Sequence, residues 1–374
     1  MFTSSATVPL KPHNPSNDYE VACPLDIEGI SSLNFSPVSN FLVATGWNSN
    51  AYVWEYDQQL SSQGKAQNNG ILPVLCSAWR PDGSSIFLGG CDKLVRLWNL
   101  STNQTTTVAQ HDQPIRDCFY LTANNLLATA SWDKTVKYWD LRQSMPAHTI
   151  TLPERPTAMD VKDDCMAVAT ADRVVHLYDA RTGQTAMPSR PSQLRYQIRA
   201  VQIFPDKRGY LSSSVEGRVS VTYFQEVPPA KSFTFKCHRE GADVYSVNAL
   251  CFFPQYGTFL SAGSDGNICF WDKDVQQRLK TFPRTTWGSA LTQPVSPGQA
   301  GSTSAGSNFA SIPCATVDRS GSVMAYAVSY DWSKGYSELK PGVMGNYIQL
   351  HRCLDEEIKP RPKTTPAPSP TYRR

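Results

Sequence analysis

The sequence predicts an all-β fold made of repeated units, and two observations carry this prediction. Short runs alternate apolar and polar residues, as in VRLW (95–98) and VKYW (136–139), which is typical of strands with one buried face. A second pattern returns at a nearly constant spacing: small residues, an acid, a β-branched residue three positions later and usually an aromatic residue six positions after the acid. Such a repeat determines the architecture.

The period of the repeat is typical of one architecture. Its anchor positions are separated by 44, 41, 39, 44 and 49 residues, and they are Asn48, Asp92, Asp133, Asp172, Glu216 and Asp265. Each unit has room for four strands and for turns such as Pro81-Asp82-Gly83, where Pro restricts φ and Gly accepts a positive φ. Units of this length that end in Trp-Asp are WD repeats, which stack radially. We therefore expect a seven-bladed WD-repeat β-propeller.

A seventh unit is expected near the C-terminal end, from the runs SVMAYAV (322–328) and NYIQLHR (346–352). Its turn acid, Asp331, stands 66 residues after the preceding one. The excess lies in the Gly, Ser, Ala and Pro-rich stretch 293–307, which we interpret as a flexible insertion. The unit lacks one strand, so we expect the N-terminal run DYEVACP (18–24) to pair with it and close the ring.

The composition is that of a folded protein. Hydrophobic residues make up 40% and charged residues 18% of the chain, which argues against intrinsic disorder and against a charged coiled coil. No stretch approaches the roughly 18 consecutive apolar residues of a membrane-spanning helix, and the first residues lack the apolar segment of a secretory signal. Ten cysteines form no C-x-x-C pair. We expect a soluble, intracellular protein without a metal site or membrane insertion.

Charge is concentrated at the C-terminal end. We expect a flexible extension at 1–17, a propeller over 18–358 and a basic, Pro-rich tail at 359–374. The formal net charge is only +3, but the tail has no acid and five cations, Lys359, Arg361, Lys363, Arg373 and Arg374. These five are the expected RNA-binding residues, because a basic unstructured segment attracts phosphates. A merely solubilising tail is the alternative.

His111 could be read as a catalytic base, with Ser131 and Asp133 completing a triad. In WD repeats, however, a His before the first strand, a hydroxyl in the second, the turn acid and the Trp form a buried hydrogen-bond network. His111, Asp133 and Trp139 stand at those positions, with Thr129 or Ser131 as the hydroxyl. The chain also lacks the common nucleophile, phosphate-loop, dinucleotide and zinc-protease motifs. We expect a structural network, no catalytic residue, no cofactor and no enzyme.

Two segments are candidates for recognition of another molecule. In KSFTFKCHRE (231–240), Lys236, His238 and Arg239 cluster around two Phe residues, a combination suited to a peptide or to single-stranded nucleic acid. Strand alternation predicts that both Phe side chains point into the blade. In YDWSKG, Trp332 stands one residue after the turn acid, where a structural Trp is not expected, and Lys334 is nearby. We expect these five residues to form a peptide-binding surface.

The sequence resembles a specific family, the nuclear-pore mRNA export WD-repeat factors of the Rae/Gle type. The resemblance runs through every blade, and FTFKCHR and YDWSKG are not general features of WD repeats. The departures from the family pattern are the insertion at 293–307 and the two terminal extensions. The motifs that carry the resemblance are LNFSP, CDKLVRLWNL, AQHDQPI, SWDKTVKYWD, LPER, EGRVSV, FTFKCHR, GSDGNICFWDKD, YDWSKG and EEIKPR.

This resemblance implies a propeller that docks a short GLEBS motif of an FG-repeat nucleoporin and links messenger ribonucleoprotein to the nuclear pore. It further implies RNA affinity, a part in spindle assembly, and a monomer within a heterocomplex. The implied location is the nucleus, the nuclear pore complex and the nuclear envelope, with shuttling to the cytoplasm. Arg239 is expected to pair with an acidic residue of the peptide, and Trp332 and Lys334 to form a surface for peptide or RNA.

Two other binding functions stay open at this point. A related mitotic-checkpoint propeller binds similar motifs on checkpoint kinases, which adds kinases and spindle components to the candidate partners. The tetrapeptide Trp139-Asp140-Leu141-Arg142 fits the W-D-x-R pattern of substrate receptors of cullin ubiquitin ligases. Because Trp-Asp ends many WD blades, this second signal is weak.

Overall fold

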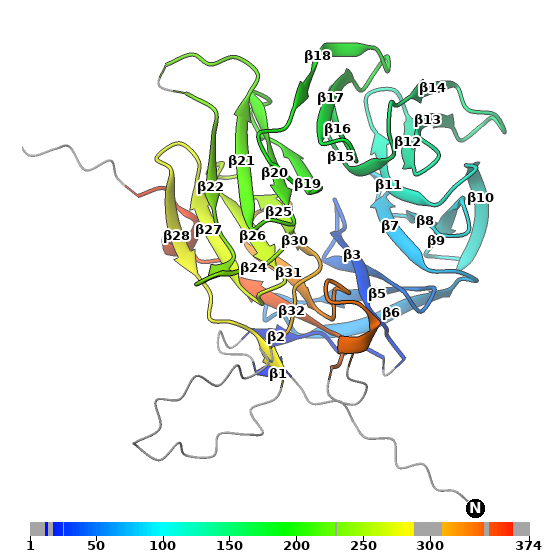
Figure 1. Ribbon diagram of the computed structural model, residues 1–374. Coiled ribbons are helices and arrows are strands. Elements are labelled where there is room, and N and C mark those ends of the chain that lie inside the picture. Colours follow the sequence, from blue (N-terminus) through cyan, green and yellow to red (C-terminus); the bar gives the residue numbers. More distant parts are fainter. Residues whose placement is uncertain are drawn as a thin grey trace, which may run out of the picture.

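The computed structural model consists of seven four-stranded antiparallel sheets arranged as blades around a common axis (Figure 1). It describes residues 12–13, 18–24, 26–228, 230–287, 309–339 and 344–361. The expected insertion at 293–307 lies outside these residues, as do most of the expected extension at 1–17 and the tail after Arg361. The seven-bladed propeller predicted from the repeat is confirmed.

The first six blades each use four consecutive strands. Blade 1 has β3 (Ile30–Phe35), β4 (Phe41–Gly46), β5 (Asn50–Tyr56) and β6 (Ser62–Asn69); blade 2 has β7 (Val74–Trp79), β8 (Ser85–Gly90), β9 (Leu94–Asn99) and β10 (Gln104–Gln110); blade 3 has β11 (Ile115–Leu121), β12 (Leu126–Ser131), β13 (Thr135–Asp140) and β14 (His148–Thr151). Blade 4 has β15 (Pro156–Lys162), β16 (Cys165–Thr170), β17 (Val174–Asp179) and β18 (Thr185–Pro191); blade 5 has β19 (Ile198–Ile203), β20 (Gly209–Ser214), β21 (Arg218–Tyr223) and β22 (Phe233–Lys236); blade 6 has β25 (Val247–Phe252), β26 (Phe259–Gly263), β27 (Ile268–Asp272) and β28 (Gln277–Thr281).

Blade 7 joins the two ends of the chain. Its strands are β30 (Ala315–Val317), β31 (Val323–Val328), β32 (Tyr347–Arg352) and, from the N-terminal side, β2 (Tyr19–Glu20). Two short pairs complete the sheets, β1 (Pro12–His13) with β29 (Thr286–Trp287) and β23 (Arg239–Glu240) with β24 (Asp243–Val244). The described residues include two short helices, the 3₁₀ helix Tyr336–Glu338 and α1 (Asp355–Ile358).

The blades hold together through their faces. The first strands of neighbouring blades lie side by side around the axis, so β3 contacts both β7 of blade 2 and β30 of blade 7 (Figure 1). Apolar side chains of adjacent blades then share one core: Val43 and Val53 of blade 1 pack with Trp98 of blade 2, whose side chain is fully buried. Burial of a large apolar side chain contributes about 1.5–3 kcal/mol. Each blade is therefore stable mainly because its neighbours cover it.

The ring closes through the predicted N-terminal strand. Tyr19 pairs with Leu350 and Glu20 with Gln349 in antiparallel register, and the Val21 N–H donates to the Ile348 carbonyl at 2.9 Å. The N-terminal strand β2 thereby supplies the outer strand of a blade whose other three strands come from the C-terminal end. A propeller without this strand would leave β32 with an open edge.

A charged cluster reinforces this closure. His351 Nδ1 lies 2.6 Å from Asp18 Oδ1, and its Nε2 lies 3.0 Å from Glu357 Oε2, while the Glu357 carboxylate also pairs with Lys280 of blade 6. Burial alone would lower the pKa of His351, but the hydrogen bonds to Asp18 and Glu357 outweigh it and raise the pKa to about 9. One imidazolium thus links the N-terminal segment, β32 and α1.

Some described residues fall in the parts expected to be flexible. Pro12–His13 belongs to the expected extension at 1–17, yet it pairs with Thr286–Trp287 as β1 and β29. Arg361, in the expected tail, donates from Nη2 to the Leu279 carbonyl at 2.8 Å. Among the described residues, no helix is long and apolar enough to cross a membrane.

The closure cluster predicts a pH-dependent stability. The pKa of His351 is raised on folding, so its contribution is complete below its ordinary pKa near 6.5 and is lost as pH rises through about 9. We expect His351→Gln to lower the free energy of unfolding by about 2–3 kcal/mol at pH 6, with a smaller loss at pH 9.5. Urea unfolding at both pH values measures this. The control is His148→Gln, which changes an exposed histidine. An equal loss of unfolding free energy at both pH values in His351→Gln would contradict the assigned role of His351.

Candidate functional site

The loops of the propeller emerge on two faces. Because strands alternate in direction, the turn between the second and third strands of a blade and the link to the next blade leave on the same face, here called the top face. The other turns form the bottom face. On the top face the β23–β24 hairpin follows blade 5, and the 3₁₀ helix lies in the loop that joins β31 to β32.

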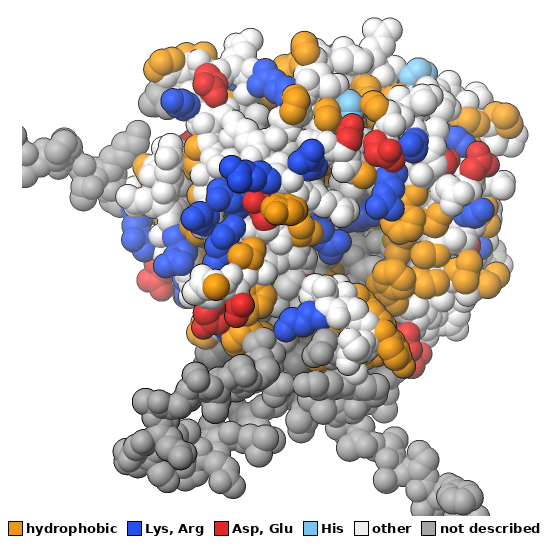
Figure 2. All heavy atoms as spheres, in the orientation of Figure 1, with side chains coloured by type: hydrophobic (Ala, Val, Ile, Leu, Met, Phe, Trp, Pro, Cys, Tyr) orange, Lys and Arg blue, Asp and Glu red, His pale blue; other side chains and the backbone are white. Residues whose placement is uncertain are grey.

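Exposed apolar side chains gather on the top face. Of the fourteen large hydrophobic side chains that are exposed among the described residues, nine lie on its turns and links. Figure 2 shows hydrophobic side chains close to a group of Lys and Arg side chains on the face that carries the 3₁₀ helix. We call the nine the top-face apolar surface: Trp47, Ile71, Leu72, Trp132, Tyr196, Val215, Val244, Trp332 and Tyr336.

Trp332 lies at the centre of an aromatic group. It has a positive φ of 59°, which is unusual for a bulky residue, in a turn closed by the Gly335 N–H donating to its carbonyl at 3.0 Å. Its ring lies nearly parallel to that of Tyr336, with centroids 6.5 Å apart. A Cβ on Gly29 would lie 3.2 Å from Trp47 Cδ1 and 3.7 Å from Trp332 Nε1. The absence of a side chain at Gly29 therefore lets both indoles approach, and they remain 45% exposed each.

A polar cavity of about 530 Å³ opens beside Trp332, between blades 5, 6 and 7. Asp331 in its wall accepts a hydrogen bond from Asn248 Nδ2 at 2.9 Å and another from Ser264 Oγ. Burial lowers the pKa of Arg199, which also lines the cavity, although Asp331 counteracts the shift. Lys334 is exposed on its rim. The cavity thus offers both signs of charge beside an exposed indole.

Arg239 begins the β23–β24 hairpin and is half-buried. Its Nε and Nη2 donate to the carbonyls of Gly217 at 3.3 Å and Glu216 at 2.6 Å, so the guanidinium is fixed against a top-face turn of blade 5. A guanidinium has five N–H donors, and its Nη1 supplies two further ones. Val244 of the same hairpin lines the cavity beside Trp332 and Lys334. The hairpin that Arg239 begins therefore reaches the cavity beside Trp332 through Val244.

His238 requires a correction. It was expected on the peptide-binding surface, but it is only 5% exposed. Its Nδ1 lies 2.7 Å from Asp265 Oδ1, and its Nε2 lies 2.8 Å from Ser261 Oγ, which also accepts a hydrogen bond from Trp271 Nε1 at 2.8 Å. These contacts form a buried network that leaves no nitrogen of His238 for a ligand. Lys236, two residues earlier in the strand, is exposed.

His111, which precedes the first strand of blade 3, has the same kind of surroundings. Its Nδ1 lies 2.8 Å from Asp133 Oδ2 and its Nε2 lies 2.7 Å from Thr129 Oγ1, to which Trp139 Nε1 donates at 2.9 Å. Thr129 therefore provides the hydroxyl, while Ser131 donates to the Gln113 carbonyl. Burial opposes ionisation of Asp133, but hydrogen bonds from His111 and Thr135 hold its pKa well below the usual range. The geometry ties strands together inside the blade.

The remaining predicted residues are spread over the chain. Lys359 follows α1 and is exposed, as is Arg361, whereas Lys363, Arg373 and Arg374 lie outside the described residues. Arg142 is the last residue of the W-D-x-R tetrapeptide. Its guanidinium contacts both carboxylate oxygens of Asp140, at 2.9 and 2.7 Å, and points into solvent on the bottom face. No group of three His, Cys, Asp or Glu residues suited to a metal ion occurs in the described part of the chain.

Sequence reasoning missed most of the top-face apolar surface. Trp47 and Trp132 each stand immediately before the turn residue of a repeat, Asn48 or Asp133, and not at the end of the third strand where the structural Trp stands. A Trp in a turn has no sheet to pack against, so this offset is the signal that would have found both. Isolated Ile71 and Leu72 had no comparable signal.

Comparison with known proteins places these features in a family. Repeats of the type described as "WD domain, G-beta repeat" match residues 26–55, 64–99, 102–140 and 230–272. The chain is similar to the "Poly(A)+ RNA export protein" of Schizosaccharomyces pombe, with 40% identity over 96% of both chains. It is also 44% identical to "Protein RAE1" of Arabidopsis thaliana, over 94% of this chain and 95% of the relative, and 36% identical to "mRNA export factor GLE2" of Chaetomium thermophilum, over 92% and 93%.

The contrast between His238 and Lys236 predicts different consequences of substitution. His238→Gln removes a partner of Asp265, whose carboxylate is fully buried, and we expect a loss of about 2–4 kcal/mol in the free energy of unfolding. Lys236→Gln changes an exposed side chain and is expected to change stability by less than about 0.5 kcal/mol. Urea unfolding monitored by Trp fluorescence compares the two. Equal stability of both variants would rule out the structural role of His238.

Proposed function

Because the chain belongs to the Rae/Gle family of WD-repeat mRNA export factors, we propose that it is a non-enzymatic adaptor in mRNA export. In this proposal its top face docks a GLEBS-type motif of an FG nucleoporin, and it thereby links messenger ribonucleoprotein to the nuclear pore complex at the nuclear envelope. The observation that carries the proposal is the concentration of nine exposed hydrophobic side chains on that single face. Large exposed apolar patches on soluble proteins mark interaction sites.

The make-up of the top-face apolar surface supports a peptide ligand. Trp and Tyr account for five of its nine members, and these residue types dominate binding hot spots because they bury a large area with few rotatable bonds. The members come from turns of different blades, which the ring holds at fixed positions. A peptide that crosses this face would contact several blades at once, without needing a deep cleft.

Arg239 supplies the charge complement in this proposal. The two carbonyl contacts fix its guanidinium against Glu216 and Gly217, which follow Val215 of the cavity wall, and a pre-oriented fork recognises a carboxylate better than a flexible cation does. Trp332 and Lys334 lie across the cavity from this hairpin. We propose that an acidic residue of the motif pairs with Arg239 while an apolar residue packs on Trp332. His238 has no part in this surface.

RNA contact is proposed as a second, weaker activity. The five tail cations Lys359, Arg361, Lys363, Arg373 and Arg374 stand without an acid among them and would neutralise phosphates with little sequence preference. The two that the structure describes are exposed. Because they follow α1 on the bottom face, RNA held there would not compete with a peptide on the top face.

The docking site is tested by charge reversal. We expect Arg239→Glu to weaken binding of a synthetic GLEBS peptide by about 10–100-fold, since it replaces a charge-assisted pair with repulsion. Trp332→Ala should cost a similar factor. Isothermal titration with the full chain measures both. The control is Arg278→Glu, an exposed position on the outer strand β28. Undiminished affinity of Arg239→Glu would remove Arg239 from the site.

The RNA contribution of the tail is tested by truncation. Ending the chain after Pro360 removes four of the five tail cations. For binding of an oligouridine, the plot of log affinity against log salt concentration should then become less steep by about 3, because each lost phosphate contact lowers the slope by roughly 0.7. Filter binding over a salt series provides the slopes. The matched control lacks residues 1–10, which contain no charged side chain. An unchanged slope would place RNA binding on the propeller itself.

A further inference from the structure

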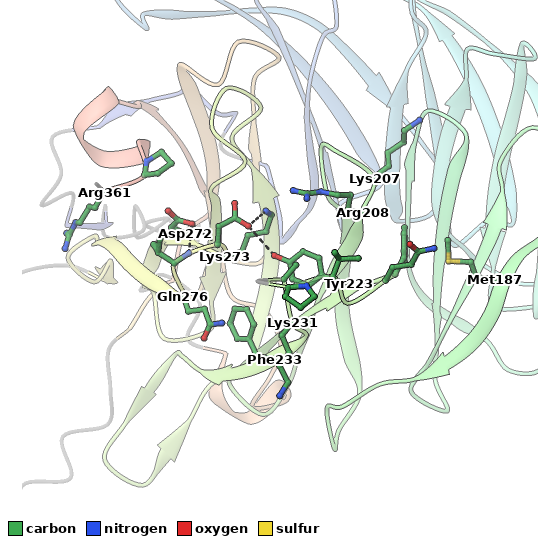
Figure 3. A pocket seen from close by; sticks show the side chains of 18 residues that line it. Met187, Lys207, Arg208, Tyr223, Lys231, Phe233, Asp272, Lys273, Gln276 and Arg361 are labelled. Carbon is green, nitrogen blue, oxygen red and sulfur yellow. Dashed lines mark hydrogen bonds and ion pairs between the residues drawn. The ribbon is translucent and has the colours of Figure 1, made fainter. Parts of the chain in front are cut away.

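The bottom face contains a groove that the proposed function does not use. Its volume is about 900 Å³, at the upper end of the ~300–1,000 Å³ that is usual for ligand sites. Lys207 and Arg208 reach it from the turn between β19 and β20, and 273–276 from the turn between β27 and β28. Both turns belong to the bottom face, opposite Arg239 and Trp332. Figure 3 shows the labelled side chains around this space, which we call the bottom groove.

The floor of the bottom groove is apolar. It is formed by Met187, Tyr223, Phe224, Val227, Phe233 and Val275, from blades 4, 5 and 6. Four of these side chains are only half-buried, and that of Val227 is 63% exposed. Partly covered apolar side chains gathered from three blades gain free energy when a ligand removes them from water. A ligand with one or two large apolar side chains would satisfy this floor.

The charges around the bottom groove are unbalanced. Five cations line it, Lys207, Arg208, Lys231, Lys273 and Arg361, against two carboxylates, Asp272 and Asp274. Asp272 is buried, and its carboxylate accepts hydrogen bonds from the backbone N–H groups of Asp274 at 2.8 Å and Val275 at 3.3 Å. Its negative charge therefore stabilises the turn.

Two of the cations have no carboxylate partner. Lys207, Arg208 and Lys273 each form an ion pair at 2.7–2.8 Å, with Asp164, Asp206 and Asp274 respectively. Among the described residues, no carboxylate lies within 4.0 Å of Lys231 or Arg361, both of which are exposed. Figure 3 shows Arg361 well apart from Lys231 and Phe233, with Met187 at the opposite end of the groove from Arg361. Hydrogen bonds from Ser232 lower the pKa of the Glu226 carboxyl, and Lys231 is close enough to help lower it. Arg361 donates to the Leu279 carbonyl, but neither cation forms an ion pair within the described part of the chain. The groove therefore presents an apolar floor and two positive charges without an ion-pair partner in that part.

From this geometry we propose that the bottom groove binds an acidic peptide segment of a partner protein, with large apolar side chains on the floor and carboxylates at Lys231 and Arg361. Nucleic acid fits less well, because the Tyr223 ring is 3% exposed and offers no face on which a base could stack. The chain's own segment 362–374 fits less well too, because its only charges are three cations.

The proposal is tested with one probe and its charge inverse. The probe is the fluorescein-labelled peptide acetyl-Asp-Glu-Phe-Leu-Glu-Asp-amide, titrated with the full chain while fluorescence anisotropy is recorded. We expect saturable binding that the combined change Lys231→Glu and Arg361→Glu weakens by about tenfold or more. Val227→Asp should weaken it similarly. The inverse peptide acetyl-Lys-Arg-Phe-Leu-Arg-Lys-amide should not bind.

Controls separate this groove from the top face. Arg239→Glu and Arg278→Glu should leave the affinity for the probe unchanged. The proposed nucleoporin site and the bottom groove are therefore tested independently, and either proposal can fail without the other. Absence of saturable binding, or equal affinity of the double variant, would overturn the proposal. Because Arg361 is also one of the proposed RNA contacts, an oligouridine is expected to compete through that residue alone; competition that persists in Arg361→Glu would assign the groove to RNA and overturn the proposal. An affinity about tenfold higher after removal of 362–374 would identify that segment as the occupant, which also overturns it.

Discussion

The structure depends on closure of the ring, because no blade can cover its own faces. Each sheet packs against two neighbours, and blade 1 reaches its second neighbour only if blade 7 is complete. The N-terminal strand β2 completes blade 7 on β32. The buried His351 then ties Asp18 to Glu357, so that both ends of the chain are held by the same side chain. A ring closed in this way keeps loops from distant parts of the sequence at constant separations.

The repeats place His and Trp residues both inside the blades and on the surface of the ring. His111 and His238 lie inside blades, where each satisfies a turn acid and a hydroxyl that burial would otherwise leave unpaired. Trp139 and Trp271 donate to the same hydroxyls. Trp47, Trp132 and Trp332 stand in turns of the same repeats and are exposed. A displacement of a few residues along the repeat thus separates a buried, stabilising side chain from an exposed one.

The two faces offer similar chemistry at separate places. On the top face, Arg239 pairs with Val244, which lines the cavity beside Trp332; on the bottom face, Lys231 and Arg361 line a groove with an apolar floor. Strands of about six residues separate the faces by roughly 20 Å, too far for one short peptide to span both sites. Ligands held at the two sites would therefore not compete.

The sequence by itself determined the repeat, the number of blades and the strand that closes the ring, because alternation and a period near 40 residues are local properties. It also marked Arg239 and Trp332 through their unusual positions. The repeat also carried a signal for the burial of His238, which precedes the first strand of blade 6 as His111 precedes that of blade 3, but the neighbouring Phe and Arg residues suggested a surface instead. Only the tertiary structure decided the bottom groove, because Met187, Phe233 and Arg361 become neighbours only when three blades and the C-terminal segment meet in space.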